Sequence, residues 1–329
     1  MRLVVAPDKF RGTLTARQAT EALAAGLRAA GHDVVEVPLA DGGEGTLDAL
    51  GGPNKVTTVT GPLGDPVAAQ WRLAGRKAVI EMARASGLAV VGGAEANDAV
   101  AASTYGTGEL IAVALDAGAN DLVVAVGGSA TTDGGLGALR ALFPLHRIRG
   151  VSLTVACDVR LRFLDAARVF GPQKGASDTQ VELLARRLER LAEVYREEYG
   201  VDVTGLDGGG AAGGLAGGLA CVGATLVPGF ELVAERLGLD ELLEGADGVV
   251  TGEGFLDDES FDGKVVGGVA DLAVDLGVPV VAVVGECFDG TERRVPTVSL
   301  VRSCGRERAL GDAAACLGEV VPRVLALLG

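Results

Sequence analysis

Valine-rich runs and helical patterns alternate at the two ends of the chain. Runs at residues 3–6, 33–38, 248–251 and 278–284 predict strands, because each is apolar and ends near Gly, Pro or Asp. The spacing predicts helices that open near Thr15, cover 264–276 and fill much of 307–328. Gln18 completes a capping box with Thr15, and Gly31 closes that first helix. Strands in which apolar and polar residues do not alternate, separated by helices, indicate a parallel sheet covered on both faces.

The middle of the chain has a different pattern. Residues 56–60, Pro66–Ala74 and Lys77–Glu81 are consecutive strand-like runs joined by Gly and Pro turns, with no room for helices between them. They predict a half-solvated antiparallel meander. Farther along, the apolar stripe that includes Val181 and Tyr195 predicts a long surface helix.

Together these patterns predict an α/β fold with two domains. One domain is built from residues 1–50 and 225–329, and the other is inserted at residues 51–224. Residues 207–218 are glycine-dense but contain Ala and Leu at intervals. They are either a linker or the start of a tightly packed helix.

Composition and charge restrict the partners that the protein can bind. The chain has 329 residues with 29 Lys and Arg against 44 Asp and Glu, which gives a formal net charge of −15. An acidic chain without a basic run lacks the positive surface that nucleic acid or an anionic membrane requires, so we expect neither partner. An anionic substrate would need local Lys, Arg or backbone N–H groups to reverse the field at its site.

Histidine and cysteine usage limits metal chemistry. The two histidines and five cysteines form no CxxC pair and no HExxH pair, which argues against a structural zinc site. Scattered, odd-numbered cysteines fit buried thiols in a reducing compartment. The chain runs from Met1 directly into a strand without a signal-peptide core, so we expect a cytoplasmic protein. Residues 265–285 carry Asp271, Asp275 and Pro279 and indicate helix, turn and strand instead of a membrane span.

Glycine clusters follow most of the predicted strands, each with an acid, a hydroxyl or a lysine. They lie at residues 6–12, 40–46, 127–135, 170–175, 208–214 and 251–254. Open parallel sheets bind ligands beyond the carboxyl ends of their strands, and glycines there let backbone N–H groups approach a phosphate. No GxxxxGK[ST] occurs. Gly208, Gly210 and Gly213 match GxGxxG, but a poor strand precedes them.

The charged residues in these clusters are suited to phosphoryl transfer. The acids are Asp8, Asp41, Asp133, Glu253 and Asp257, and the bases are Lys9, Arg11, Lys174 and Lys264. Transfer from a nucleotide needs Mg²⁺ held by carboxylates, cations and N–H groups on the moving phosphoryl, and a carboxylate that takes the hydroxyl proton.

Structural roles for the same residues stay open. An Asp before two glycines is commonly a turn former or a helix cap, and Thr131 and Thr132 would more often cap a helix. Lys174 is either a phosphate ligand or a solvated turn lysine. Lys264 at a helix start opposes the helix dipole, which favours an anion-binding role. Cys157 is better explained as a small buried residue than as a nucleophile.

Ten motifs in order give the chain a resemblance to the bacterial glycerate kinase family, which phosphorylates D-glycerate with ATP and Mg²⁺. The motifs are APDKFRGTL at 6–14, PLADGGEGT at 38–46, TGPLGDPV at 60–67, IEMARASGL at 80–88, STYGTGELI at 103–111, VGGSATTDGG at 126–135, ACDV at 156–159, VFGPQKGA at 169–176, GGGAAGGL at 208–215 and TGEG at 251–254. The resemblance implies two α/β domains, one Rossmann-like with a parallel sheet from both chain ends and one inserted and mixed, with the active site in the cleft between them.

The chain departs from the family pattern at several positions. The family usually has Asn at Thr132, Asn-Pro-Leu at 160–162, Arg at Phe255 and Gln near Glu259, and it is longer between residues 143 and 151. The Phe255 position matters most, because a phenyl ring cannot replace a bidentate carboxylate partner.

The resemblance implies a role for each matching residue. Asp41 or Asp133 would act as general base or Mg²⁺ ligand, with Asp8 in the same catalytic group. Lys9 and Arg11 would hold the substrate carboxylate, and Glu253 and Asp257 would also bind substrate. The residues that would face the triphosphate of ATP are Gly127, Gly128, Ser129, Lys174 and Lys264.

Alternative functions follow from the same residues. The chain could be a kinase of another small hydroxy acid, a catalytically silent metabolite-binding relative, or a nicotinamide-dependent oxidoreductase through Gly208–Gly213. The last alternative lacks a ribose-binding acid about 20 residues onward. Which hydroxyl of glycerate is phosphorylated, and whether the protein forms a homodimer, are not decided by the sequence.

Overall fold

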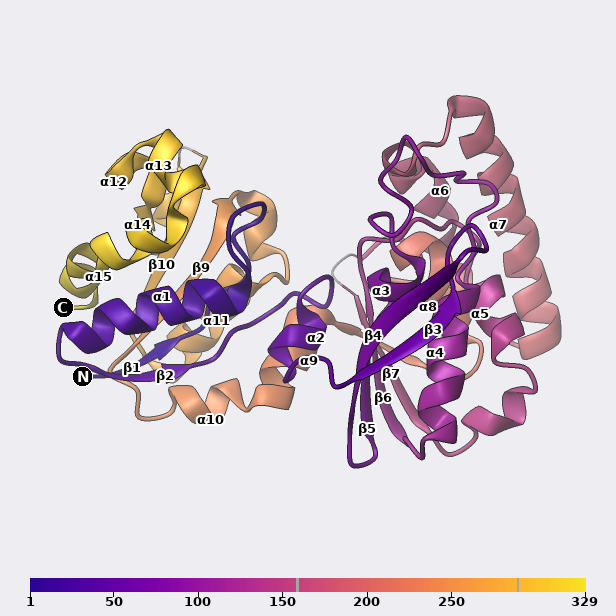
Figure 1. Cartoon of the computed structure of the whole chain (residues 1–329), viewed down its shortest axis with the longest axis horizontal. Coiled ribbons are helices and arrows are strands. Elements are labelled where there is room, and N and C mark those ends of the chain that lie inside the picture. The colour runs from indigo at the N-terminus through magenta and orange to yellow at the C-terminus, as the bar shows by residue number, and fades with distance from the viewer. Residues whose placement is uncertain (158–159, 289) are drawn as a thin grey trace. The chain divides into compact units, whose positions relative to one another are not determined.

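The computed structural model describes residues 1–157, 160–288 and 290–329 (Figure 1). The Asp and Val of the ACDV motif, at 158 and 159, lie outside the described residues. The chain forms two compact units. The first comprises Met1–Asp41, Asp48–Leu50 and Gly229–Gly329, and the second comprises Gly42–Leu47 and Gly51–Pro228.

The first unit contains a parallel sheet made from both ends of the chain. In spatial order its strands are β11 (Thr297–Ser299), β10 (Val280–Cys287), β9 (Gly248–Leu256), β1 (Arg2–Val5) and β2 (Asp33–Glu36). All four pairings are parallel, and Val4 lies in register with Val35 on one side and Val249 on the other. The predicted parallel sheet is confirmed.

Helices cover both faces of this sheet. They are α1 (Ala16–Ala29), α9 (Gly229–Leu237), α10 (Leu239–Leu243), η5 (Asp258–Phe261), α11 (Val265–Leu276), η6 (Thr291–Arg293), α12 (Leu300–Cys304), α13 (Arg306–Gly311), α14 (Ala313–Glu319) and α15 (Val321–Leu328). Leu3 and Val5 of β1 pack with α1, α14 and α15, whereas Val4 packs with α9, α10 and α11. Successive strand residues point to opposite faces, so both faces of β1 are buried in apolar contacts.

Two predictions for this unit have different outcomes. The capping box of α1 is confirmed, because the N–H of Gln18 donates to Thr15 Oγ1 at 3.2 Å and the N–H of Thr15 donates to Gln18 Oε1 at 2.9 Å. The predicted helix across 307–328 is instead broken into α13, α14 and α15. Asp312 caps α14, and Pro322, in the first turn of α15, has no N–H to continue the preceding helix.

The second unit contains a mixed sheet. In spatial order its strands are β3 (Lys55–Thr60), β4 (Pro66–Ala74), β5 (Lys77–Glu81), β6 (Asp121–Val126), β7 (Ser152–Cys157) and β8 (Thr225–Pro228). The pairings β3–β4 and β4–β5 are antiparallel, and those from β5 to β8 are parallel. The antiparallel meander is therefore confirmed. Cys157, at the end of β7, is buried as expected.

The helices of the second unit form two layers over its sheet. They are α3 (Ala83–Ser86), α4 (Tyr105–Asp116), α5 (Leu136–Ala141), η1 (Leu145–Ile148), η2 (Phe163–Asp165), α6 (Ala166–Phe170), η3 (Pro172–Lys174), α7 (Asp178–Tyr199), η4 (Val203–Gly205) and α8 (Ala211–Ala220), while α2 (Thr46–Ala49) lies at the boundary of the two units. Helices α4, α5 and α8 pack on the sheet, and α6 and α7 pack behind them (Figure 1). Gly200 ends α7 in the left-handed region, at φ 69°.

The glycine-dense segment after residue 207 is a packed helix with a break in it, which decides between the two predicted alternatives. Ala212, Gly213 and Gly214 have left-handed backbone angles inside α8. A Cβ on Gly213 would lie 2.0 Å from the carbonyl oxygen of Thr131, so the helix approaches the β6 loop too closely for a side chain. The 3₁₀ helix η4 precedes this segment in place of the strand that a dinucleotide fingerprint requires.

Candidate active site

Three strands of the first unit end close together and carry the predicted acids. The N–H of Asp8 donates to Gly252 O at 2.8 Å, which joins the segment after β1 to β9, and the N–H of Leu39 donates to Pro7 O at 3.0 Å. These bonds extend the pairing beyond the strand ends. They place Asp8, Asp41 and Glu253 at the carboxyl edge of one parallel sheet, where such sheets bind ligands.

Lys9 is paired with two of these acids. Its Nζ lies 3.6 Å from Asp8 Oδ2 and 3.5 Å from Asp41 Oδ1. Burial raises the pKa of Asp8 to about 6, and the positive charge of Lys9 limits that rise while Asp41 adds to it. Burial also acts to lower the pKa of Lys9, but the carboxylates of Asp8 and Asp41 outweigh it and raise that pKa. Lys9 therefore stays charged in a largely buried position.

Glu253 is an acid with a raised pKa and an unused oxygen. Burial raises its pKa to about 7, and hydrogen bonding to Ser260 opposes the rise. Its Oε1 is buried and has no hydrogen-bond partner among the described residues. Such a group can accept a proton near neutral pH.

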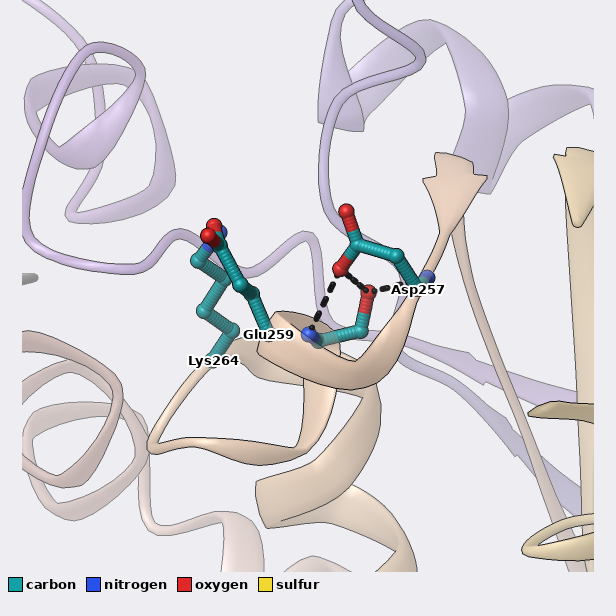
Figure 2. Close-up of polar contacts among 4 residues, drawn as sticks. Asp257, Glu259 and Lys264 are labelled. Atoms are coloured by element: carbon teal, nitrogen blue, oxygen red, sulfur yellow. Dashed lines mark hydrogen bonds and ion pairs between the residues drawn. The ribbon is translucent and has the colours of Figure 1, made fainter. Parts of the chain in front are cut away.

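The turn after β9 holds Asp257 and Lys264. The carboxylate of Asp257 accepts hydrogen bonds from the N–H of Ser260 at 3.1 Å and from its hydroxyl at 3.2 Å, and thereby caps η5. Lys264 Nζ lies 3.4 Å from Glu259 Oε2, and Figure 2 shows this pair apart from Asp257. Asp257 thus has a local structural role, as its sequence context allows.

Arg11 is exposed beside the same strand ends. A Cβ on Gly254 would lie 2.8 Å from the backbone nitrogen of Arg11, so the glycine of the TGEG motif permits this close approach. The charge of Arg11 acts on Lys9, where it opposes the rise in pKa. Arg11 forms no ion pair with the acids that the structure describes and is available for an anionic ligand.

The loop after β6 carries the glycine cluster of the second unit. Gly128 O accepts from the N–H of Leu88 at 2.8 Å, and Ser129 forms an isolated bridge with Gly87. A Cβ on Gly127 would lie 2.8 Å from the Cα of Gly43, and one on Gly128 would lie 2.3 Å from Glu44 Oε1. Gly127 permits this packing of backbone on backbone, and Gly128 permits a left-handed φ of 64° beside the Glu44 side chain.

Asp133 is held by many donors in the same loop. Its Oδ2 accepts from the N–H of Thr104 at 2.8 Å and of Gly137 at 3.1 Å, and its Oδ1 accepts from the N–H of Gly135 at 3.1 Å. The hydroxyl of Thr104 lies 3.1 and 2.9 Å from the two oxygens, and that of Ser103 lies 3.4 Å from Oδ2. The carboxylate anchors the starts of α4 and α5.

Lys174 is buried, so the solvated alternative is wrong. Its exposed fraction is 6%, and its Nζ donates to Thr131 O at 2.6 Å. Burial lowers its pKa to about 7, against the influence of the Asp133 charge. The hydroxyls of Thr131 and Thr132 have no partner in the described parts of the chain. They do not cap α5, which has no side-chain cap.

The predicted site residues therefore form two groups, one in each unit. Asp8, Lys9, Arg11, Asp41, Glu253, Asp257 and Lys264 belong to the first unit, and Gly127, Gly128, Ser129, Asp133 and Lys174 belong to the second. Within the described ranges no cluster of three or more acids, histidines or cysteines could hold a metal. A hollow of about 400 Å³ near Arg302 and Arg323 contains none of these residues.

Sequence reasoning missed Asn97, which lies next to Lys174. Its Nδ2 donates to Ala130 O at 3.0 Å and to Lys174 O at 2.8 Å. Asn97 stands outside the glycine clusters, so no sequence signal marked it. No helix among the described residues is long and apolar enough to cross a membrane.

Comparisons with known proteins give the class and the family. A model of the Glycerate kinase family matches residues 3–143 and 145–328. The chain is 41% identical to a glycerate kinase of Halalkalibacterium halodurans, over 88% of this chain and 87% of the relative. It is 38% identical to the glycerate 2-kinase of Escherichia coli K12, over 88% of this chain and 86% of the relative.

A solved structure agrees with these relatives. The crystal structure of a protein from Salmonella typhimurium LT2 assigned as glycerate kinase 2 has a TM-score of 0.84 and 36% identity, and the match covers 100% of this chain and 98% of the other. The protein is therefore of the class of ATP-dependent phosphotransferases with an alcohol group as acceptor. Within that class, the chain belongs to the glycerate kinase family.

Proposed function

We propose that this enzyme transfers the γ-phosphoryl group of ATP to a hydroxyl of D-glycerate and forms 2-phosphoglycerate. The observation that carries the proposal is the position of Lys9, whose Nζ lies within 3.6 Å of both Asp8 and Asp41 at the carboxyl edge of the parallel sheet. The glycerate 2-kinase of E. coli supports transfer to the 2-hydroxyl over the alternative product, 3-phosphoglycerate.

Lys9 and Arg11 bind the carboxylate of the hydroxy acid in this proposal. Lys9 remains protonated because its two acids raise its pKa against the effect of burial. Arg11 contributes a guanidinium that can hold a carboxylate through two parallel hydrogen bonds. These two cations would overcome the repulsion between an acidic chain and an anionic substrate.

Glu253 takes the proton of the attacking hydroxyl. Its Oε1 is buried and unbonded among the described residues, and its pKa of about 7 suits a base at neutral pH. The hydroxyl oxygen forms its bond to the γ-phosphorus, the bond to the ADP oxygen breaks, and the proton goes to Glu253. Asp257 supports this region through its cap on η5.

Asp8 and Asp41 fit a Mg²⁺ ion better than Asp133 does. Mg²⁺ in kinases is held by one or two carboxylates plus phosphate oxygens and water, so two acids suffice. The oxygens of Asp133 already accept bonds from Thr104, Gly135 and Gly137. When bound, the ion would neutralise charge on the phosphates. We assign Asp133 a positioning role instead of the base or ligand role.

The glycine loop and Lys174 of the second unit bind the nucleotide phosphates. Gly127, Gly128 and Ser129 supply a backbone turn, and Lys174 supplies a buried ammonium group. Lys264, at the start of α11, stays a proposed phosphate ligand. We also propose that the enzyme is cytoplasmic, which agrees with five cysteines scattered along the chain.

Steady-state kinetics of K9M test the proposal. We expect kcat/KM for D-glycerate to fall about 100-fold or more while KM for ATP changes little, because Lys9 would pair with the carboxylate of the hydroxy acid and not with the nucleotide. The matched control is K55M, which removes an exposed lysine at the start of β3. Unchanged glycerate kinetics in K9M would remove Lys9 from the site.

A second candidate function is the phosphorylation of another small hydroxy acid. Phe255, where the family usually has Arg, makes an edge-to-face contact with Phe288 at 4.9 Å, and both rings are exposed. Phe255 lies two residues beyond Glu253 on β9, and Phe288 follows the end of β10. This apolar pair would favour a substrate with an apolar substituent. Rates across D-glycerate, glycolate and D-lactate distinguish the candidates, and turnover of any of them excludes a silent relative.

A further inference from the structure

Lys174 is a buried cation without an anionic partner. Its side chain bonds only to the neutral carbonyl of Thr131, and no carboxylate among the described residues forms an ion pair with it. Burying an ammonium group is costly unless a charge or several hydrogen bonds compensate. Asp133 is near enough to influence Lys174, but its oxygens are bonded to other donors.

Two threonine hydroxyls beside Lys174 are buried and unbonded. Thr131 and Thr132 are 0% and 2% exposed, and neither Oγ1 has a hydrogen-bond partner in the described residues. Two other buried threonines of this unit are bonded, Thr104 to Asp133 and Thr107 to Ser86, whereas Thr46 Oγ1 also has no partner among the described residues. Most buried polar groups in proteins are hydrogen-bonded, so two successive exceptions next to a buried lysine point to a ligand.

The backbone that carries these groups is tightly fixed. Asn97 joins Ala130 to Lys174 through its amide, at 3.0 and 2.8 Å. A Cβ on Gly175 would lie 2.2 Å from Ala94 O, and one on Gly213 would lie 2.0 Å from Thr131 O. The hydroxyls and the ammonium are therefore held in place before any ligand arrives, which lowers the entropic cost of binding.

We infer that Lys174, Thr131 and Thr132 form a pocket for phosphoryl oxygens, in which both threonine hydroxyls donate directly to the phosphate chain of the nucleotide. The inference deepens the proposed function and rests on it for the identity of the anion. It adds Thr131 and Thr132 as ligand-contacting residues, whereas their sequence context indicated helix caps.

Calorimetric binding of the non-hydrolysable analogue AMP-PNP, with adenosine as the phosphate-free probe, tests the pocket. We expect T131V and T132V each to weaken AMP-PNP binding about 5-fold to 50-fold, because each loses a hydrogen bond to a charged group. T132S keeps the hydroxyl and should bind within about 3-fold of wild type. Adenosine affinity should not change.

The control is T20V, which removes a buried hydroxyl bonded within α1 at Ala16. T20V should bind AMP-PNP as the wild type does. Thermal unfolding of the ligand-free variants separates binding from stability. T131V and T132V should melt at or above the wild-type temperature, because valine removes a buried hydroxyl that has no partner among the described residues.

Two results separate the inference from the proposed function. Wild-type affinity for AMP-PNP in both T131V and T132V would overturn the pocket even if the enzyme phosphorylates glycerate. Hydroxyl-dependent binding of AMP-PNP in a protein that phosphorylates no hydroxy acid would support the pocket and overturn the proposed function.

Discussion

The hydroxyl of Thr104 lies 3.1 Å from one carboxylate oxygen of Asp133 and 2.9 Å from the other. It also accepts the N–H of Ala138 at 3.0 Å, so a single threonine joins the start of α4 to α5 through Asp133. A carboxylate with this many donors is a structural anchor. This anchor holds the loop that carries Thr131 and Thr132.

D133N should destabilise the protein, because an amide presents N–H groups to backbone donors that need an acceptor. We expect a loss of about 2–4 kcal/mol in the free energy of unfolding, and about 1–3 kcal/mol for T104V, measured by urea denaturation. D65N, in an exposed turn, is the control and should stay within about 0.5 kcal/mol of wild type. A fully stable but inactive D133N would favour a direct catalytic role.

The rate should depend on pH through Glu253. Its pKa is raised by burial to about 7, so the proton-accepting form increases as pH rises through that value. We expect kcat/KM for glycerate to decrease below about pH 7 in wild type. In E253Q, kcat/KM should be lower by about 100-fold or more, and this decrease at acid pH should be absent. E235Q, on the exposed side of α9, should keep the wild-type profile. An unchanged acid limb in E253Q would exclude Glu253 as the base.

Stability should depend on pH in the opposite direction to that of a salt-bridged acid. Between the ordinary pKa of 4.5 and the folded value of about 7, the folded state binds more protons than the unfolded state, so stability falls as pH rises. E253Q should therefore be more stable than wild type at pH 8, by roughly 1–3 kcal/mol, and equal to it near pH 4. Thermal melts at both pH values measure the difference. A destabilised E253Q at pH 8 would contradict burial as the cause.

Gly213 should not tolerate a side chain. It has φ 68°, and its Cβ would meet Thr131 O at 2.0 Å, whereas Gly200 has φ 69° with nothing within 4 Å. G200A should lower the free energy of unfolding by about 1–2 kcal/mol, because alanine disfavours the left-handed backbone. G213A should lower it clearly more, because of the additional close contact. G213A should also weaken AMP-PNP binding, because it displaces the carbonyl that holds Lys174. Equal costs for the two variants would mean that the close approach is relaxed in solution.

Sequence patterns predicted the elements that depend on interactions between residues close together in the sequence. The Thr15 and Gln18 capping box and the β3–β5 meander follow from residues adjacent in sequence. The predicted helix across 307–328 is interrupted by local features at Asp312 and Pro322. The apolar periodicity that continues across both residues predicted one helix in spite of them. The sheet that joins β1 to β9 followed from the absence of alternation in both strands.

The membership of the candidate site stays a prediction, and the surroundings of its residues were less well predicted. Charge and glycine context marked Asp133 and Lys174 as candidates. The donors from Thr104 and the burial of Lys174 depend on contacts between segments about 30 to 80 residues apart, which no single-sequence pattern encodes. Asn97 carries no motif at all, and its function is visible only through the two carbonyls that it binds.

Detection of the product by ³¹P NMR tests the central claim most directly. Wild-type enzyme with ATP, magnesium chloride and D-glycerate should form a phosphate monoester at the 2-position with an equimolar amount of ADP. Persistence of ATP with D-glycerate and with every other small hydroxy acid supplied would contradict the account.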